Sequence, residues 1–175
     1  MYNVLVLGSG NNCTRQVCKA EREFDFSDSK LTKIDMDTNC GADIVMDMDG
    51  VGTTHALPFS DNEFDEIHAY NCLEHWGRQG DWKGFFNEFK EYHRVLKVGG
   101  EFICLVPINS DAVADPGHTR FFSLNHFGFL NQNFYKDNLD KGTCVTDYRW
   151  YWKDNFELAF VNTSKSHIAV RMVKT

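Results

Sequence analysis

Residues 4–12 have the sequence VLVLGSGNN, and the rest of the chain is organised around this stretch. Val4 to Leu7 form an apolar run, which is typical of a strand buried on both faces of a parallel sheet. Gly8 and Gly10 follow at once and predict a tight turn, because glycine takes positive φ angles readily. Such a turn lets backbone N–H groups approach a bound ligand. The glycine turn therefore indicates a site for a nucleotide-like ligand. Because the third glycine of the dinucleotide fingerprint is missing, a plain strand-to-helix connection is the alternative.

The composition indicates one globular domain with a substantial core. Of the 175 residues, 42% are hydrophobic and 14% are aromatic. The net charge of −7 disfavours a general nucleic-acid binder, because an acidic surface repels phosphate groups. There is no leader pattern and no apolar segment of bilayer length, so we expect a cytoplasmic protein without a membrane partner. The six cysteines include no CxxC pair, which predicts reduced thiols.

Residues 31–36 (LTKIDM) predict a second strand with an acidic residue at its tip. In sheets of this type, such a residue accepts hydrogen bonds from ribose hydroxyls. We interpret Asp35 as this acceptor, with Asp37 as the alternative. An aspartate that merely starts a turn is the structural alternative.

The connections around these strands are short. Residues 14–23 predict a short crossover helix, whereas the gap before the next apolar segment at residues 42–46 is too short for a second one. One face of the sheet is then thinly covered. We expect either the bound ligand or a second copy of the chain, in a homo-oligomer, to cover it.

Two stretches in the middle of the chain carry the most specific information. Residues 57–75 have the sequence LPFSDNEFDEIHAYNCLEH, a turn that leads into a strand. Residues 89–101 have the sequence FKEYHRVLKVGGE, and residues 102–107 (FICLVP) follow as a strand. Together they resemble the fourth strand, the following helix with its Arg-Val-Leu ending, and the fifth strand of class I S-adenosylmethionine-dependent methyltransferases. The chain is identified as a small, minimal member of that group.

The resemblance implies an α/β fold with a Rossmann-like, mostly parallel sheet, an antiparallel C-terminal hairpin and few helices. It also implies S-adenosylmethionine as the cofactor. The implied cofactor-binding positions are Gly8, Gly10, Asn12, Asp35, Met36, Asp47, Met48, Asn71 and Cys72. Asp47 is expected to accept from the adenine amine and Met48 to pack on the ring, while Asn71 lies near the amino-acid end. The acidic residue that the family often has before the first glycine is Val6 here.

The segment after Pro107 is expected to form the acceptor side. An Asp-Pro-Gly turn at residues 115–117 precedes His118 and Arg120, beyond the carboxyl end of a parallel strand, where open α/β sheets bind ligands. We interpret His118 as a candidate base and Arg120 as a candidate anion anchor, with a hydrogen-bonded brace of the loop as the alternative. No metal site is predicted, because His118, His126 and Asp115 fit no ligand spacing.

Aromatic residues recur at helical spacing in residues 82–96, which predicts a core helix capped by Gly99 and Gly100 in the left-handed conformation. Alternation at residues 148–152 suggests strand structure, as do residues 156–161 and 167–173.

The expected organisation is a single domain over residues 1–175. Within it, residues 1–107 form the cofactor-binding core, residues 108–145 the acceptor-side loop and helix, and residues 146–175 the C-terminal hairpin.

Three functions remain open from the sequence. The first is methyl transfer from S-adenosylmethionine to a small-molecule or protein acceptor. The second is a methyltransferase-like binding protein that has lost turnover, which Val6 and the missing third glycine suggest. The third is a nicotinamide-dependent oxidoreductase. A covalent role for Cys72 is disfavoured, because no proline precedes it, and we interpret it as a buried structural cysteine.

Overall fold

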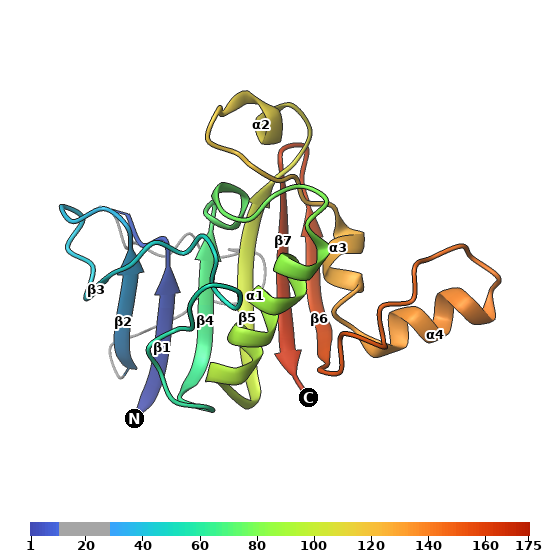
Figure 1. Cartoon of the computed structure of the whole chain (residues 1–175), viewed down its shortest axis with the longest axis horizontal. Helices are drawn as coiled ribbons and strands as arrows, with labels where there is room; N and C mark the ends of the chain where they lie inside the picture. The colour runs from blue at the N-terminus through green and yellow to red at the C-terminus, as the bar shows by residue number, and fades with distance from the viewer. Residues whose placement is uncertain (11–28) are drawn as a thin grey trace.

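A seven-stranded sheet runs through the computed structural model, which describes residues 1–10 and 29–175 (Figure 1). The strand order is β3-β2-β1-β4-β5-β7-β6. The strands β1 to β5 pair in parallel, whereas β7 pairs antiparallel with both β5 and β6. The elements are β1 (Tyr2–Leu7), β2 (Ser29–Asp35), β3 (Ile44–Val45), β4 (Phe64–Tyr70), the 3-10 turn η1 (Leu73–His75), α1 (Trp82–Val95), β5 (Leu96–Pro107), α2 (Asn109–Ala114), α3 (Leu124–Gly128), α4 (Gln132–Asp140), β6 (Phe156–Thr163) and β7 (His167–Lys174).

The opening strand β1 lies inside the sheet, between β2 and β4. Val4, Leu5 and Leu7 are fully buried, which explains why the run has almost no polar residues. The predicted fold class is confirmed, including the antiparallel C-terminal hairpin formed by β6 and β7.

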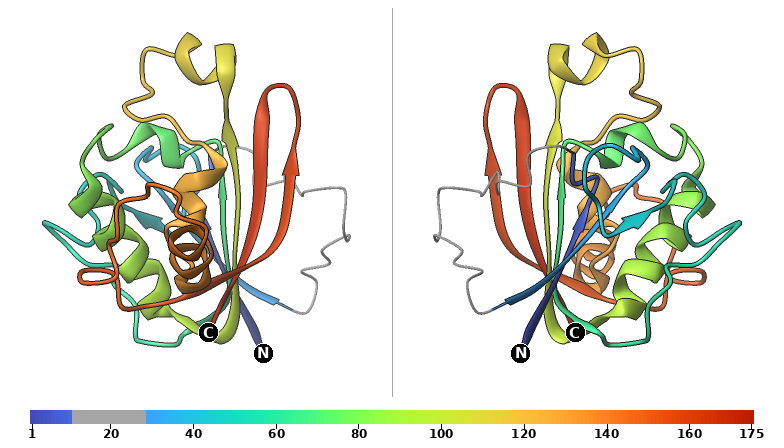
Figure 2. Two further views of the ribbon diagram at one scale, coloured as in Figure 1. Left: turned by 90° about the vertical axis from the view of Figure 1, so that its right-hand side faces the viewer. Right: turned by 90° about the vertical axis from the view of Figure 1, so that its left-hand side faces the viewer.

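The helices α1, α3 and α4 lie on the same face of the sheet (Figure 2). The helix α1 buries Phe86, Phe89 and Tyr92, and the Tyr92 ring stacks on Phe102 of β5 with centroids 5.1 Å apart. The aromatic stripe is therefore core, as predicted. The connection from β2 to β3 contains no helix, also as predicted, whereas the predicted helix at residues 14–23 lies outside the described residues. Within the described ranges, no helix has the length and apolar character needed to cross a membrane.

Two local predictions are wrong. Gly99 and Gly100 do not cap α1, which ends at Val95, with Leu96 already extended. They lie inside β5, where the register jumps from Phe64↔Leu96 to Glu66↔Glu101, so extra residues of β5 bulge outward. Gly99 has a φ of +78°, so its conformational freedom serves the bulge rather than a helix end.

Residues 148–152 form a turn instead of a strand. The backbone N–H groups of Tyr151 and Trp152 both donate to the Tyr148 carbonyl, at 2.8 and 2.9 Å. Trp152 is buried and stacks on Phe86 of α1, with centroids 5.7 Å apart. The aromatic side chains pack against α1 rather than across a sheet, which explains their spacing.

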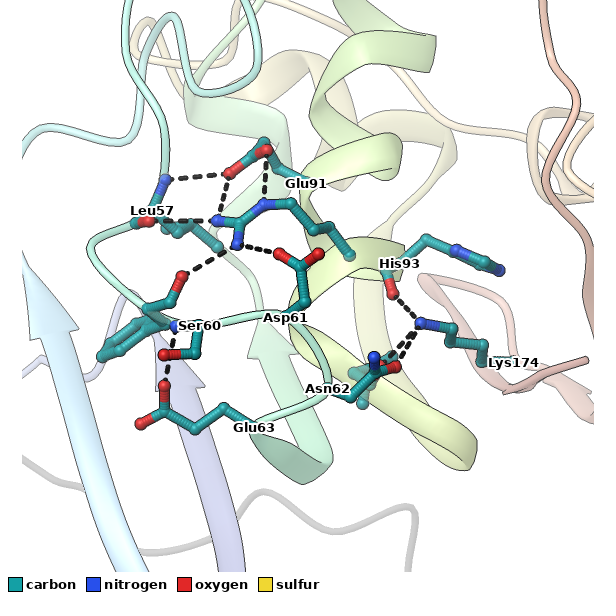
Figure 3. Close-up of polar contacts among 11 residues, drawn as sticks. Leu57, Ser60, Asp61, Asn62, Glu63, Glu91, His93 and Lys174 are labelled. Atoms are coloured by element: carbon teal, nitrogen blue, oxygen red, sulfur yellow. Dashed lines mark hydrogen bonds and ion pairs between the residues drawn. The ribbon is translucent and has the colours of Figure 1, made fainter.

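Arg94, near the end of α1, joins the two motifs that suggested the family. Its guanidinium donates to the carbonyls of Leu57 and Phe59 and to the carboxylates of Asp61 and Glu91, at 2.8 to 3.1 Å. Glu91 also accepts from the Leu57 N–H at 3.0 Å (Figure 3). The planar guanidinium fork thus fixes the loop before β4 against the helix.

Lys174, at the end of β7, holds the same helix end from the other side (Figure 3). Its Nζ donates to the carbonyls of His93 and Leu96, both at 2.7 Å, and to the Asn62 side chain at 2.9 Å. A cation is favourable there, because the last carbonyls of a helix carry partial negative charge. Burial lowers the pKa of Lys174 below its usual value, although Asp154 and Asp61 partly oppose this shift.

We expect Arg94→Lys to lower the free energy of unfolding by about 1–3 kcal/mol, because lysine cannot reproduce the fork of charged hydrogen bonds. Urea unfolding followed by circular dichroism measures the effect. The matched control is Arg149→Lys, since Arg149 and its partner Asp147 form a surface pair in which both side chains are 41% exposed. Equal stability of the two variants would contradict the role given to Arg94.

Candidate functional site

The glycine turn stands where β1 ends, at the carboxyl edge of the parallel strands. Gly8 and Gly10 have φ angles of +58° and +56°. A Cβ built on Gly8 would lie 2.5 Å from the Cβ of Cys72, which follows β4, whereas a Cβ on Gly10 would meet no atom of residues 1–10 and 29–175 within 4 Å. Gly8 therefore allows the ends of β1 and β4 to approach closely, and none of the described residues crowds Gly10.

Asp35 ties the glycine turn to the end of β2. Its Oδ2 accepts from the Gly10 N–H at 2.7 Å, and its Oδ1 accepts from the Asp37 N–H at 2.9 Å. Each carboxylate oxygen has a second lone pair, so both retain capacity for further donors such as hydroxyl groups. Asp37 instead accepts from the N–H of Asn39 and from its side chain, within its own turn. The structure thus brings Asp35, and not the Asp37 carboxylate, to the glycines.

Three further predicted cofactor positions, two of them exposed and one buried, are Met36 and the pair expected beside the adenine ring, Asp47 and Met48. Met36 is 68% exposed, while Met48 is 4% exposed and belongs to the hydrophobic core. Asp47 is exposed and accepts from the Asp49 N–H at 2.9 Å. The burial of Met48 does not favour the ring contact predicted for it, because little of its surface is available to a ligand. Asn12 lies outside the described residues.

Asn71 and Cys72 follow β4 directly. Asn71 has a φ of +48°, and its N–H donates to the Leu105 carbonyl of β5 at 2.8 Å. The Cys72 thiol is buried and donates to the Leu7 carbonyl at 3.4 Å. Burial raises the pKa of Cys72 well above its usual value. A thiol that stays protonated is a poor nucleophile, which favours a structural role for Cys72.

An open cleft of about 560 Å³ adjoins this edge. Its walls come from the segment after β4, from η1, from the end of β5, from α2 and the loop after it, and from the start of β7. The lining residues are Asn71, Glu74, His75, Pro107, Asp111, Ala114, Asp115, Pro116, His118 and His167. Glu74 is only 2% exposed, and burial raises its pKa to about 7. The Nε2 atom of His118 lies 3.8 Å from the Glu74 carboxylate. The cleft therefore combines a buried carboxyl with the predicted histidine.

A buried ion pair positions the loop that carries His118. Arg120 donates to both carboxylate oxygens of Glu88 on α1, at 2.6 and 2.9 Å, and to the Leu73 carbonyl at 2.8 Å. The neighbouring Thr119 N–H donates to the Glu74 carbonyl at 2.9 Å. Because these Arg120 donors are engaged inside the fold, the geometry does not favour Arg120 as an anion anchor. It favours the alternative role, a hydrogen-bonded brace of the loop.

The sequence analysis missed Glu74, His75 and Glu88. Glu74 and His75 stand in the quoted stretch at residues 57–75, and a Glu-His pair a few residues after a parallel strand was the available signal. Nothing local marks Glu88 as buried, since it lies 32 residues from its partner Arg120. His126 lies apart from the cleft, in a capping box with Ser123 at the start of α3.

Comparison with known families supplies the decisive observation. The model of the family described as "Methyltransferase domain" matches residues 7–104, which is more than half of the chain. The chain belongs to this methyltransferase family. The predictions of a class I methyltransferase and of S-adenosylmethionine as its cofactor are thereby confirmed. No curated protein matches the sequence.

Solved structures share the fold of this methyltransferase at low identity. A SAM-dependent methyltransferase from Aquifex aeolicus has a TM-score of 0.58 and 12% identity, over 99% of this chain and 82% of that one. The YcgJ protein from Bacillus subtilis has a TM-score of 0.53 and 18% identity, over 99% and 92%. A geranyl diphosphate C-methyltransferase from Streptomyces coelicolor, solved with Mg²⁺, geranyl diphosphate and S-adenosyl-L-homocysteine, has a TM-score of 0.53 and 11% identity, over 100% and 74%.

We expect Gly8→Ala to destabilise the methyltransferase by at least about 2 kcal/mol more than Gly10→Ala. Both substitutions strain a positive φ, but only the first drives a methyl group into Cys72. Urea unfolding measures the difference. The double variant Gly8→Ala with Cys72→Gly should recover part of the loss, and equal effects of the two single variants would contradict the close approach.

Alkylation should distinguish the cysteines. At pH 8, iodoacetamide is expected to label the exposed Cys144 and to leave Cys72 unmodified, because Cys72 is buried and its raised pKa keeps it protonated. Mass spectrometry of the digested protein reads out each site. Rapid labelling of Cys72 in the folded protein would revive a nucleophilic role.

Proposed function

We propose that the chain transfers the methyl group of S-adenosylmethionine to a small-molecule acceptor bound in the cleft beside β4. One observation supports this most. The glycine turn with Asp35 and the cleft with Glu74 and His118 meet at the same edge of the sheet, on either side of the segment Asn71–Cys72.

The residues around the glycine turn fit the cofactor. None of the described residues crowds Gly10, and the Asp35 carboxylate has lone pairs beyond those that accept from Gly10 and Asp37, which could accept from the two ribose hydroxyls. We assign the packing contact on the adenine ring to Met36, because a thioether packs favourably on aromatic rings and Met36 is exposed next to Asp35. Asp47 would accept from the adenine amine, and Asn71 would lie at the amino-acid end. Bound S-adenosylmethionine supplies an activated methyl group on its sulfonium.

The size of the cleft suits a small-molecule acceptor. A volume of about 560 Å³ lies within the usual range for small-ligand sites. Methyl transfer requires chiefly that the acceptor nucleophile be aligned with the methyl group. In this proposal, residues 1–107 bind the cofactor, residues 108–145 build the acceptor side and residues 146–175 complete the sheet. A protein side chain that enters the cleft is the alternative acceptor.

Calorimetric titration with S-adenosylmethionine, S-adenosylhomocysteine and NAD tests the proposed function. We expect both sulfur compounds to bind and NAD not to bind. The absence of binding at millimolar concentrations of either sulfur compound would contradict the proposal. Binding of NAD alone would favour an oxidoreductase.

Asp35→Ala should weaken binding of S-adenosylhomocysteine by about 1–3 kcal/mol, because the hydrogen bonds to the ribose are lost. The matched control is Asp37→Ala, which removes a nearby carboxylate that faces its own turn. The same calorimetric titration compares the two variants with the wild-type chain. A loss confined to Asp37→Ala would transfer the ribose role to that residue.

A further inference from the structure

Three side chains in the cleft form a cluster that methyl transfer alone does not require. Glu74, His75 and His118 each offer a ligand atom, and these atoms all lie within 4.8 Å of one another. The first two come from η1, directly after β4, and the third comes from the loop after α2. The cluster therefore depends on the tertiary fold, not on a motif in the sequence.

The carboxylate of Glu74 is the least satisfied polar group of the cluster. Glu74 is 2% exposed and lines the cleft, yet neither of its oxygens has a hydrogen-bond partner in residues 1–10 and 29–175. Burying a carboxylate without hydrogen bonds is costly, so such a group normally has a partner. A cation in the cleft would supply one.

His118 is already oriented for coordination. Its Nδ1 lies 2.7 Å from the Ala112 carbonyl, which can only accept, so the proton of the neutral ring is on Nδ1. The Nε2 lone pair is then free to coordinate, and this atom faces Glu74 at 3.8 Å. Histidines that bind metal almost always donate their other N–H in this way. The His118 side chain is only 8% exposed, and Arg120 braces its loop.

His75 completes the cluster from the exposed side. Its ring meets the His118 ring at an interplanar angle of 77°, with centroids 4.7 Å apart. A Cβ added to Gly117 would lie 3.2 Å from the His75 Nδ1, so the glycine of the Asp-Pro-Gly turn leaves room for this ring. Two imidazoles and one carboxylate are thus held together by η1 and a braced loop.

We propose that Glu74, His75 and His118 bind one divalent transition-metal ion of the zinc or cobalt type. Two histidines and one glutamate are a known ligand set for such ions and leave coordination positions for water or substrate. The oxygen-preferring ions Mg²⁺ and Ca²⁺ suit this set less well, because two of its three ligands are imidazoles. The proposed metal site does not depend on the proposed function. Only one further role rests on that function, namely that the open coordination positions of the metal hold an oxygen atom of the acceptor.

Titration of the EDTA-treated chain, residues 1–175, with Co²⁺ tests the site. Calorimetry should show one ion per chain, and Mg²⁺ should not compete. The visible spectrum of bound Co²⁺ should lack the charge-transfer absorption that thiolate ligands produce, which separates this site from binding at cysteines. Added azide should change the spectrum if coordination positions open into the cleft.

The substitutions Glu74→Gln, His75→Asn and His118→Asn should each weaken Co²⁺ binding at least about tenfold. His167→Asn is the matched control, because His167 lines the same cleft but does not belong to the cluster, and it should bind Co²⁺ as the wild-type chain does. Circular dichroism melts verify that each variant is folded. His75 is exposed, so His75→Asn keeps the test valid if a buried variant fails to fold.

Three results would overturn the metal site. These are the absence of saturable Co²⁺ binding, a thiolate spectrum, or binding that the cluster variants leave unchanged. If azide leaves the Co²⁺ spectrum unchanged, the inference that coordination positions open into the cleft is wrong, but the metal site itself is not contradicted. The wild-type chain is titrated with S-adenosylhomocysteine in parallel. The absence of binding in that titration would count against the proposed function but not against the metal site.

Discussion

The close approach of β1 and β4 at Gly8 and Cys72 is the constraint on which the site depends. No side chain larger than hydrogen fits at Gly8, since even a methyl group would collide with Cys72. The two strands therefore end together, and the segments that follow them share one edge of the sheet. One segment is the glycine turn held by Asp35, and the other leads through Asn71 into η1. The proposed cofactor site and the proposed acceptor cleft are adjacent because these two strand ends approach closely.

A second layer of contacts keeps this edge rigid. Glu88 of α1 accepts from the Trp76 indole and the Tyr92 hydroxyl as well as from Arg120, so one buried carboxylate links the helix, the segment after η1 and the loop of His118. Buried ion pairs add little net stability, but removing one partner is costly. The main effect of the Arg120–Glu88 pair is thus to position the loop that carries His118, rather than to stabilise the fold. It keeps a surface loop in register with the strand end beneath it.

The sequence predicted what local patterns determine. Local sequence marks three features of the site: the apolar run of β1, the glycines after it, and Asp35 at the tip of β2. The structure places all three at the expected positions of the sheet. The prediction for Gly99 and Gly100 was wrong because a Gly-Gly pair suits a helix cap and a strand bulge equally well, and only the pairing of β4 with β5 decides between them. The partner of Arg120 and the burial of Glu74 could not be read from the sequence for the same reason. Their partners come from other elements, and burial becomes known only with the fold.

The position of β7 has a consequence for how the chain is made. The strand β5 lies between β4 and β7, and its pairing with β7 must wait until residues 167–174 have left the ribosome. Lys174, which supports the end of α1, arrives with the same segment. Until then, the nascent chain presents the edge of β5 with free backbone donors and acceptors, a surface prone to pair with other chains. Synthesis of residues 167–174 is therefore a step at which productive folding and aggregation compete.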